Sequence, residues 1–173
     1  AEILRCLHGA GMDLVLHYRS SRAPAEALQA ELEAERPGSV LLLQADLHRI
    51  DAFPGMIQEV EARFGRLDLL VNNASSFYPT PPGDITEEQW EDLVGSNLKA
   101  PLFLSQAAMP ELRKARGSVV NIVDIHARRP LRHHTVYGPA KAGLAMLTLS
   151  LAKDLAPEVR VNGVAPGAIL WPE

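Results

Sequence analysis

Short apolar runs alternate with longer stretches of mixed polarity along the whole chain. The runs are rich in Val, Leu and Ile and are bounded by turn residues, which is typical of buried strands. They predict strands at residues 13–18, 40–44, 67–71, 119–124 and 159–165. The stretches between them have the composition and spacing of helices. This alternation predicts an α/β fold, a doubly wound parallel sheet with helices on both faces.

Capping signals mark the ends of several predicted helices. Helices are expected at residues 2–10, 24–35, 52–64, 86–114 and 137–156. The segment Thr86-Glu87-Glu88-Gln89 has the pattern of a capping box, and Gly65 stands at a helix C-cap position. We expect an interruption of the long fourth helix near Gly95 or Pro101.

The two ends of the chain do not fit a complete dinucleotide-binding fold. Such a fold opens with a strand, a Gly-rich turn and a helix whose N-terminus holds the pyrophosphate. This chain begins inside a predicted helix and ends in a loop. Because the first strand is normally central, its neighbours would lack their common partner. We therefore expect residues 1–173 to be a single but incomplete dinucleotide-binding domain. A minimal variant that folds without the central strand is the alternative.

Composition narrows the class of protein. The 173 residues are 47% hydrophobic and 22% charged, as in globular proteins. The net charge of −4 argues against sequence-independent binding of nucleic acid. Cys6 is the only cysteine, and no apolar run approaches the ~20 residues that span a membrane. We expect a cytoplasmic protein without disulfides, thiolate zinc sites, nucleic-acid partners or membrane association.

Tyr137 and Lys141 are four residues apart on a predicted helix and therefore share one face. A nearby ammonium favours the tyrosinate and lowers the pKa of the phenol. Asp124 ends the predicted strand 119–124, at the carboxyl edge where ligands bind in open α/β sheets. Its carboxylate opposes tyrosinate formation, so we expect a Tyr137 that stays protonated and serves as an acid.

These residues, in this order, resemble the short-chain dehydrogenase/reductase family. The matching elements are Asn72-Asn73-Ala74, Asn97, the strand ending at Asp124, Tyr137 with Lys141, and Asn162 through Pro166-Gly167. Most relatives have Ser in place of Asp124. Asp at that position and the segment Asn73-Ala74-Ser75-Ser76-Phe77 are similar to the pteridine reductase subgroup, as is the ending 166–173.

The resemblance implies a role for each residue of the motif. Tyr137 donates a proton to substrate, Lys141 lowers its pKa and holds the nicotinamide ribose, Asp124 assists protonation, and Asn97 holds Lys141 through water. Phe77 stacks on a flat heteroaromatic ring whose other face meets nicotinamide. Ser75 contacts the same ligand. The side chains of Tyr78 and Trp171 are candidate pocket walls.

The implied cofactor is NADPH. The strand 13–18 is followed by Arg19 and Ser20, without the acid that binds ribose hydroxyls in NAD sites, and Arg suits a 2′-phosphate. Ser20 or Ser21 is expected to cap the next helix. By resemblance, the remaining contacts are Asp46 to adenine and Asn73, Ala74, Pro166 and Gly167 along the cofactor.

The remaining basic and histidine residues have a plainer interpretation. Residues Arg128, Arg129, Arg132, His133 and His134 are expected to form a solvated loop near the pocket mouth. His8 and His48 are expected at the surface. Their spacing does not predict a metal site.

Three functions remain open from the sequence. The first is NADPH-dependent reduction of a dihydropterin such as dihydrobiopterin or dihydromonapterin, with dihydrofolate as another substrate, by a homotetramer like its relatives. Residues 86–114 would supply one packing surface. The second is a carbonyl or alcohol oxidoreductase acting on another ring substrate. The third is a catalytically inactive fragment or association module, favoured by the absent phosphate-binding turn.

Overall fold

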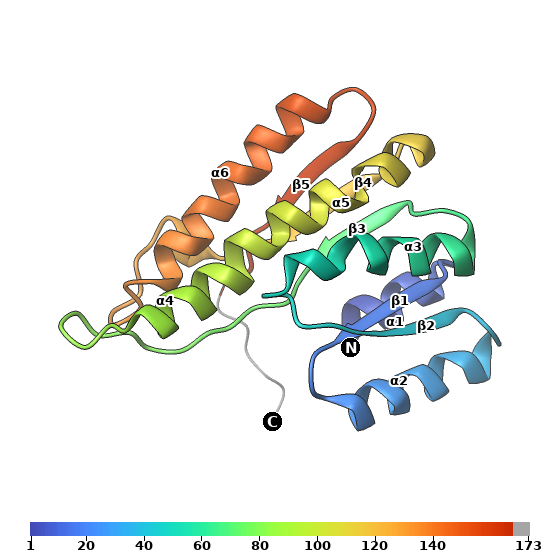
Figure 1. Ribbon diagram of the computed structural model, residues 1–173, viewed down its shortest axis with the longest axis horizontal. Helices are drawn as coiled ribbons and strands as arrows, with labels where there is room; N and C mark the ends of the chain where they lie inside the picture. The colour runs from blue at the N-terminus through green and yellow to red at the C-terminus, as the bar shows by residue number, and fades with distance from the viewer. Residues whose placement is uncertain (168–173) are drawn as a thin grey trace. The chain divides into compact units, whose positions relative to one another are not determined.

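Two parallel sheets and the helices packed on them make up the computed structural model, which describes residues 1–167 (Figure 1). Strands and helices alternate along the chain, as the hydrophobic pattern predicts. The chain divides into two compact units, Ala1–Arg66 and Leu67–Glu173. The α/β class with parallel strands, of Rossmann-like kind, is therefore confirmed.

The first unit is built on a two-stranded sheet in which β1 and β2 run parallel, with Leu14 opposite Val40. Its elements are α1 (Glu2–Gly9), β1 (Leu14–Tyr18), α2 (Arg22–Glu35), β2 (Val40–Gln44), the 3₁₀ turn η1 (Ile50–Ala52) and α3 (Phe53–Phe64). Its core joins apolar side chains of both strands to Ala25 and Leu32 of α2. Burial of these side chains is the main stabilising contribution within the unit.

The second unit is built on a three-stranded parallel sheet of order β3-β4-β5. Its elements are β3 (Leu69–Asn72), α4 (Glu87–Val94), the π-helical turn η2 (Gly95–Lys99), α5 (Ala100–Ala115), β4 (Ser118–Ile122), the 3₁₀ turn η3 (Ile125–Ala127), α6 (Tyr137–Leu155) and β5 (Arg160–Val164). Helix α5 packs on β3 and β4, and α6 packs on β4 and β5 (Figure 1). The carboxyl ends of all three strands consequently meet at one edge.

The local signals in the sequence are confirmed in most places. Thr86 and Gln89 form both hydrogen bonds of the capping box, and Gly65 closes α3 in the left-handed conformation. The interruption predicted near Gly95 is η2, and Pro101 lies in the first turn of α5. Ser21 is the N-cap of α2, but its side chain makes no capping hydrogen bond.

The strands do not join into the one sheet that the alternation predicts. Among the described residues no strand pairs with both β1 and β3. The described strands form one sheet of β1 and β2 and a second sheet of β3, β4 and β5.

A chain of buried amides and hydroxyls ties the second sheet to its helices. Asn72 Nδ2 donates to Asn121 Oδ1 at 2.8 Å and, at 3.4 Å, to Ser105 Oγ on α5. Asn121 Nδ2 donates to Thr148 Oγ1 on α6 at 2.9 Å, and Thr148 in turn donates to the Leu144 carbonyl. Asn121 and Asn72 therefore position α5 and α6 over the strands whose ends carry the candidate site.

None of the helices in the described part of the chain is long and apolar enough to cross a bilayer.

Candidate active site

The structure brings Asp124, Tyr137 and Lys141 together at the carboxyl end of β4. Asp124 follows β4 by two residues and caps η3, where its Oδ1 accepts the His126 backbone N–H at 2.8 Å. This leaves Oδ2 to accept the Tyr137 hydroxyl at 2.7 Å. Tyr137 is the first residue of α6, and Lys141 lies one turn further along the same face. The predicted grouping of the three side chains is confirmed.

The Tyr137 phenol is held in its protonated form. Burial raises its pKa well above the ordinary value of tyrosine, and the hydrogen bond to Asp124 and the charge of that carboxylate raise it further. A hydrogen bond with Ser75 acts in the opposite direction. The expected lowering of the pKa by Lys141 is not found: burial and Asp124 are the main influences on the phenol, and the ammonium lies 5.7 Å from the centroid of its ring. This geometry agrees with the expectation that Tyr137 stays protonated.

Lys141 is almost completely buried, with 3% of its side chain exposed. Its Nζ donates to the Ile122 carbonyl at 2.8 Å, at the end of β4. Burial lowers its pKa to about 8, although the charge of Asp124 opposes this shift. The ammonium is thus held at the end of β4 by this hydrogen bond.

Asn97 lies in the π-helical turn η2 and is fully buried. Its Oδ1 accepts the Ser75 hydroxyl at 2.7 Å, and its Nδ2 donates to the carbonyls of Ser76 and Leu93, both at 2.9 Å. The π turn points this amide at the loop after β3, where it holds Ser75 by a hydrogen bond. Such π turns are frequent at functional sites. No hydrogen bond joins Asn97 to Lys141 within residues 1–167, and a water bridge between them stays a prediction.

Phe77 lies beside Tyr137. It is 55% exposed, and its ring centroid lies 4.8 Å from that of Tyr137 in an edge-to-face arrangement. Tyr78, the neighbouring candidate pocket wall, packs against Tyr137 and Val136 and donates to the Gln89 carbonyl. An exposed aromatic face next to a proton donor suits a flat substrate ring. Trp171 lies outside the described residues.

His134 corrects the interpretation of the basic stretch as a solvated loop. Arg128, Arg129, Arg132 and His133 are exposed as expected, but the imidazole of His134 stacks on Phe77 at 4.7 Å. The sequence gives no signal for this contact, because it depends on two loops 57 positions apart that meet through the Thr80–His134 bridge. His8 also departs from its expected surface position, since it is buried and bonds Ser39. His48 is half-buried.

The cofactor candidates of the first unit lie after its two strands. Arg19 and Ser20 follow β1 and are exposed, and Asp46 follows β2, where it accepts the His48 backbone N–H. The Arg19 guanidinium forms no ion pair within residues 1–167, and its backbone carbonyl accepts Gln44 Nε2.

The cofactor candidates of the second unit follow β3 and β5. Asn73 and Ala74 are exposed directly after β3. Pro166 and Gly167 come after β5, and the Pro166 carbonyl accepts the Ile125 N–H, next to Asp124. These residues, together with Lys141, lie at the edge at which the strands of this unit end.

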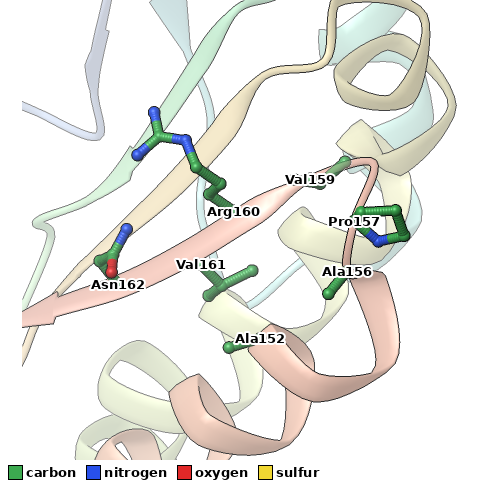
Figure 2. A pocket seen from close by; sticks show the side chains of 7 residues that line it. All are labelled: Ala152, Ala156, Pro157, Val159, Arg160, Val161 and Asn162. Atoms are coloured by element: carbon green, nitrogen blue, oxygen red, sulfur yellow. The ribbon is translucent and has the colours of Figure 1, made fainter.

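A separate groove of about 290 Å³ lies at the other end of α6 (Figure 2). It is lined by Ala152, Ala156, Pro157, Val159, Arg160, Val161 and Asn162. Ala152 is about 22 Å from Tyr137 along the helix at 1.5 Å per residue. The groove is therefore distinct from the catalytic face. No three potential metal ligands cluster anywhere in the described part of the chain.

Comparison with known proteins gives consistent matches over nearly the whole chain. The family model described as short chain dehydrogenase matches residues 1–172. Pteridine reductase 1 of Leishmania tarentolae is 36% identical over 212 aligned positions, which cover 100% of this chain and 73% of that protein. A 3-oxoacyl-[acyl-carrier-protein] reductase of Staphylococcus aureus is 34% identical, covering 92% of this chain and 65% of that protein.

The chain thus spans about two thirds to three quarters of the length of these relatives. This chain is also similar to an uncharacterized oxidoreductase of Methylorubrum extorquens, with 32% identity over 98% of this chain. The shared feature of all these matches is oxidoreductase chemistry. Together with the Asp124–Tyr137–Lys141 geometry, they establish that the chain belongs to the short-chain dehydrogenase family.

Proposed function

We propose that this oxidoreductase reduces a dihydropterin to a tetrahydropterin with NADPH. The observation that carries the proposal is the exposed Phe77 ring beside Tyr137, whose hydroxyl donates to Asp124 at 2.7 Å. The similarity to a pteridine reductase supports it. A stacking surface and a protonated phenol are the two features needed to bind a flat ring and to protonate one of its nitrogens.

When bound, NADPH supplies a hydride to the carbon of the substrate C=N bond. Phe77 binds the ring by stacking, and Tyr137 holds a proton at its hydroxyl oxygen. As hydride arrives, the adjacent ring nitrogen becomes strongly basic and takes that proton. The raised pKa of Tyr137 keeps the proton in place until then, because burial and Asp124 both disfavour the phenolate. Lys141, whose Nζ donates to the Ile122 carbonyl, would bind the nicotinamide ribose.

Among the proposed cofactor contacts, Arg19 would pair with the 2′-phosphate, and Ser20 and Asp46 would bind the adenosine part. The cofactor would also contact residues after β3 and β5 of the second sheet, namely Asn73, Ala74, Pro166 and Gly167. Assembly as a homotetramer is proposed on resemblance alone and is checked by light scattering of the purified protein.

The second candidate is reduction of a carbonyl group, as in the acyl-carrier-protein reductase of Staphylococcus aureus that this chain also resembles. The two candidates differ in their need for Phe77. A pterin needs the stacking surface, whereas a small ketone needs only the proton donor and the hydride.

Phe77→Ala separates these functions. We expect it to raise the KM for dihydrobiopterin roughly 3- to 10-fold, as for loss of one aromatic stacking contact, and to leave a simple ketone unaffected. Steady-state rates of NADPH oxidation measure both. Leu131→Ala is the control, because Leu131 lies on an exposed loop. Phe64→Ala is unsuitable, because Phe64 contacts Arg63. Equal losses for both substrates would favour the carbonyl reductase.

A further inference from the structure

Three rings meet at the catalytic face. Phe77 stacks on His134 with centroids 4.7 Å apart and an interplanar angle of 19°. Phe77 meets Tyr137 at 4.8 Å and 75°, and His134 and Tyr137 are 6.4 Å apart. These three distances form a nearly right-angled triangle with Phe77 at the corner. His134 and Tyr137 therefore do not lie on opposite faces of Phe77, and the ring remains 55% exposed.

His134 is held more firmly than the ring it contacts. Its Nδ1 lies 2.8 Å from the Arg132 carbonyl, which only accepts, so Nδ1 carries the proton. Its backbone forms a bridge with Thr80, whose N–H donates to the His133 carbonyl at 2.5 Å. The fully buried Thr80 hydroxyl accepts the Val136 N–H, one residue before the catalytic tyrosine.

Phe77, in contrast, lies in a segment without helix or strand, residues 73–79. Its ring contacts are those with His134 and Tyr137. Tyr137 meets Phe77 edge to face, whereas the imidazole lies nearly parallel to the Phe77 ring, so the imidazole is the contact that matches its ring plane. This geometry points to a fixing role for His134 and a substrate contact for Phe77.

One atom of the His134 imidazole is in an unfavourable environment. Its Nε2 is buried and has no hydrogen-bond partner within residues 1–167. A buried nitrogen without a partner is destabilising, so polar contacts at this atom do not explain the packing. Ring stacking does, and a phenyl ring in the same place would keep the stack and remove the unpartnered nitrogen.

We propose that His134 is a positioning residue that determines specificity for flat heteroaromatic substrates: it fixes the ring plane of Phe77, so that the substrate ring stacks on the face that His134 leaves open. The nature of the flat ring rests on the proposed function. The positioning of Phe77 by His134 rests on the stacking geometry alone, and it is tested separately.

Three variants separate ring stacking from hydrogen bonding. His134→Ala removes both, His134→Asn keeps a polar side chain without a ring, and His134→Phe keeps a ring without the buried nitrogen. With dihydrobiopterin, we expect the Ala and Asn variants to raise KM roughly 3- to 10-fold with kcat within about 2-fold, because stacking is lost while proton transfer is not. The Phe variant should restore the wild-type KM. An unchanged KM in His134→Ala, or rescue by Asn but not Phe, would overturn the proposal.

A spectroscopic test decides the proposal without any turnover. The chain has four phenylalanines, so fluorophenylalanine labelling gives four ¹⁹F resonances, and Phe77→Leu identifies that of Phe77. In His134→Ala, we expect the ¹⁹F chemical shift of Phe77 to move toward that of a freely rotating phenylalanine. In His134→Phe, we expect it to stay distinct from that value. An identical Phe77 resonance in wild type and His134→Ala contradicts the proposal. If wild-type protein turns over no pterin, the proposed function fails, while the ¹⁹F result still decides the role of His134.

Discussion

Tyr137 differs from a tyrosine paired only with lysine, because a carboxylate lies at its hydroxyl. Most relatives are expected to have a serine in place of Asp124, which would leave the phenol easier to ionise. Here the Asp124 contact at 2.7 Å and burial keep the phenol protonated. The sequence predicts this arrangement because Asp124 ends an apolar strand, at the carboxyl edge where ligand sites form in open α/β sheets. It does not predict His134, since stacking between loops leaves no periodic signal.

Lys141 provides a prediction for stability against pH. Its pKa is about 8 in the folded chain and 10.5 as the ordinary value, so the unfolded state binds more protons between these values. The free energy of unfolding therefore rises with pH from about 8 to 10.5 through this group. We expect the wild type to gain stability relative to Lys141→Met over that window. Urea unfolding at pH 7 and pH 10 measures the gain.

The matched control for this experiment is Lys153→Met, on the same helix but exposed. Its stability relative to wild type should stay constant across the two pH values. A Lys141→Met difference that is equally independent of pH would show that the ammonium is not destabilised by burial.

At the scale of the elements, β4 carries the site. Its interior residue Asn121 bonds the neighbouring strand and α6, and Asp124 follows its carboxyl end. The apolar run predicts the strand itself, and capping signals predict the start of α4. The π geometry of η2 is not predictable from propensity, because it depends on the hydrogen bonds that Asn97 makes to the loop after β3.

Asn121→Ala tests the buried amide chain. It leaves Asn72 without its 2.8 Å acceptor and Thr148 without a donor, in a region that water does not reach. We expect a loss of about 2–4 kcal/mol in the free energy of unfolding, since each unsatisfied buried polar group costs about 1–3 kcal/mol. Chemical denaturation measures it.

Asn162→Ala is the control, because Asn162 is an exposed residue of β5. It should change stability by less than about 0.5 kcal/mol. Equal effects of the two substitutions would mean that the buried chain contributes nothing beyond ordinary surface contacts.

At the scale of the whole molecule, the groups proposed for the cofactor are divided between two units. Arg19, Ser20 and Asp46 lie in the first, and Asn73, Ala74, Pro166 and Gly167 lie in the second. In both, they follow the carboxyl ends of parallel strands, which the sequence predicts from the order of elements. The alternation predicts one sheet, and the division of the described strands into two sheets is not predicted, because pairing between distant segments is invisible to local patterns.

Arg19→Ala tests the choice of cofactor. Removing a guanidinium that pairs with the 2′-phosphate should raise the KM for NADPH about 10- to 100-fold, as for loss of a charge-assisted hydrogen bond, and leave that for NADH unchanged. Cofactor titration measures both constants. Arg22→Ala is the control, because Arg22 is exposed and already paired with Glu26 at 2.7 Å. An equal loss for NADPH and NADH would contradict recognition of the phosphate by Arg19.

The most direct test of the proposed function is the consumption of NADPH with dihydrobiopterin, by absorbance. It is made on the protein that contains residues 1–173, beside its Tyr137→Phe variant. We expect this protein to reduce the pterin faster than a 3-oxoacyl thioester, and Tyr137→Phe to lower kcat about 10²- to 10⁴-fold. Preference for the thioester, or full activity of Tyr137→Phe, would contradict a site in which Tyr137 protonates a pterin ring.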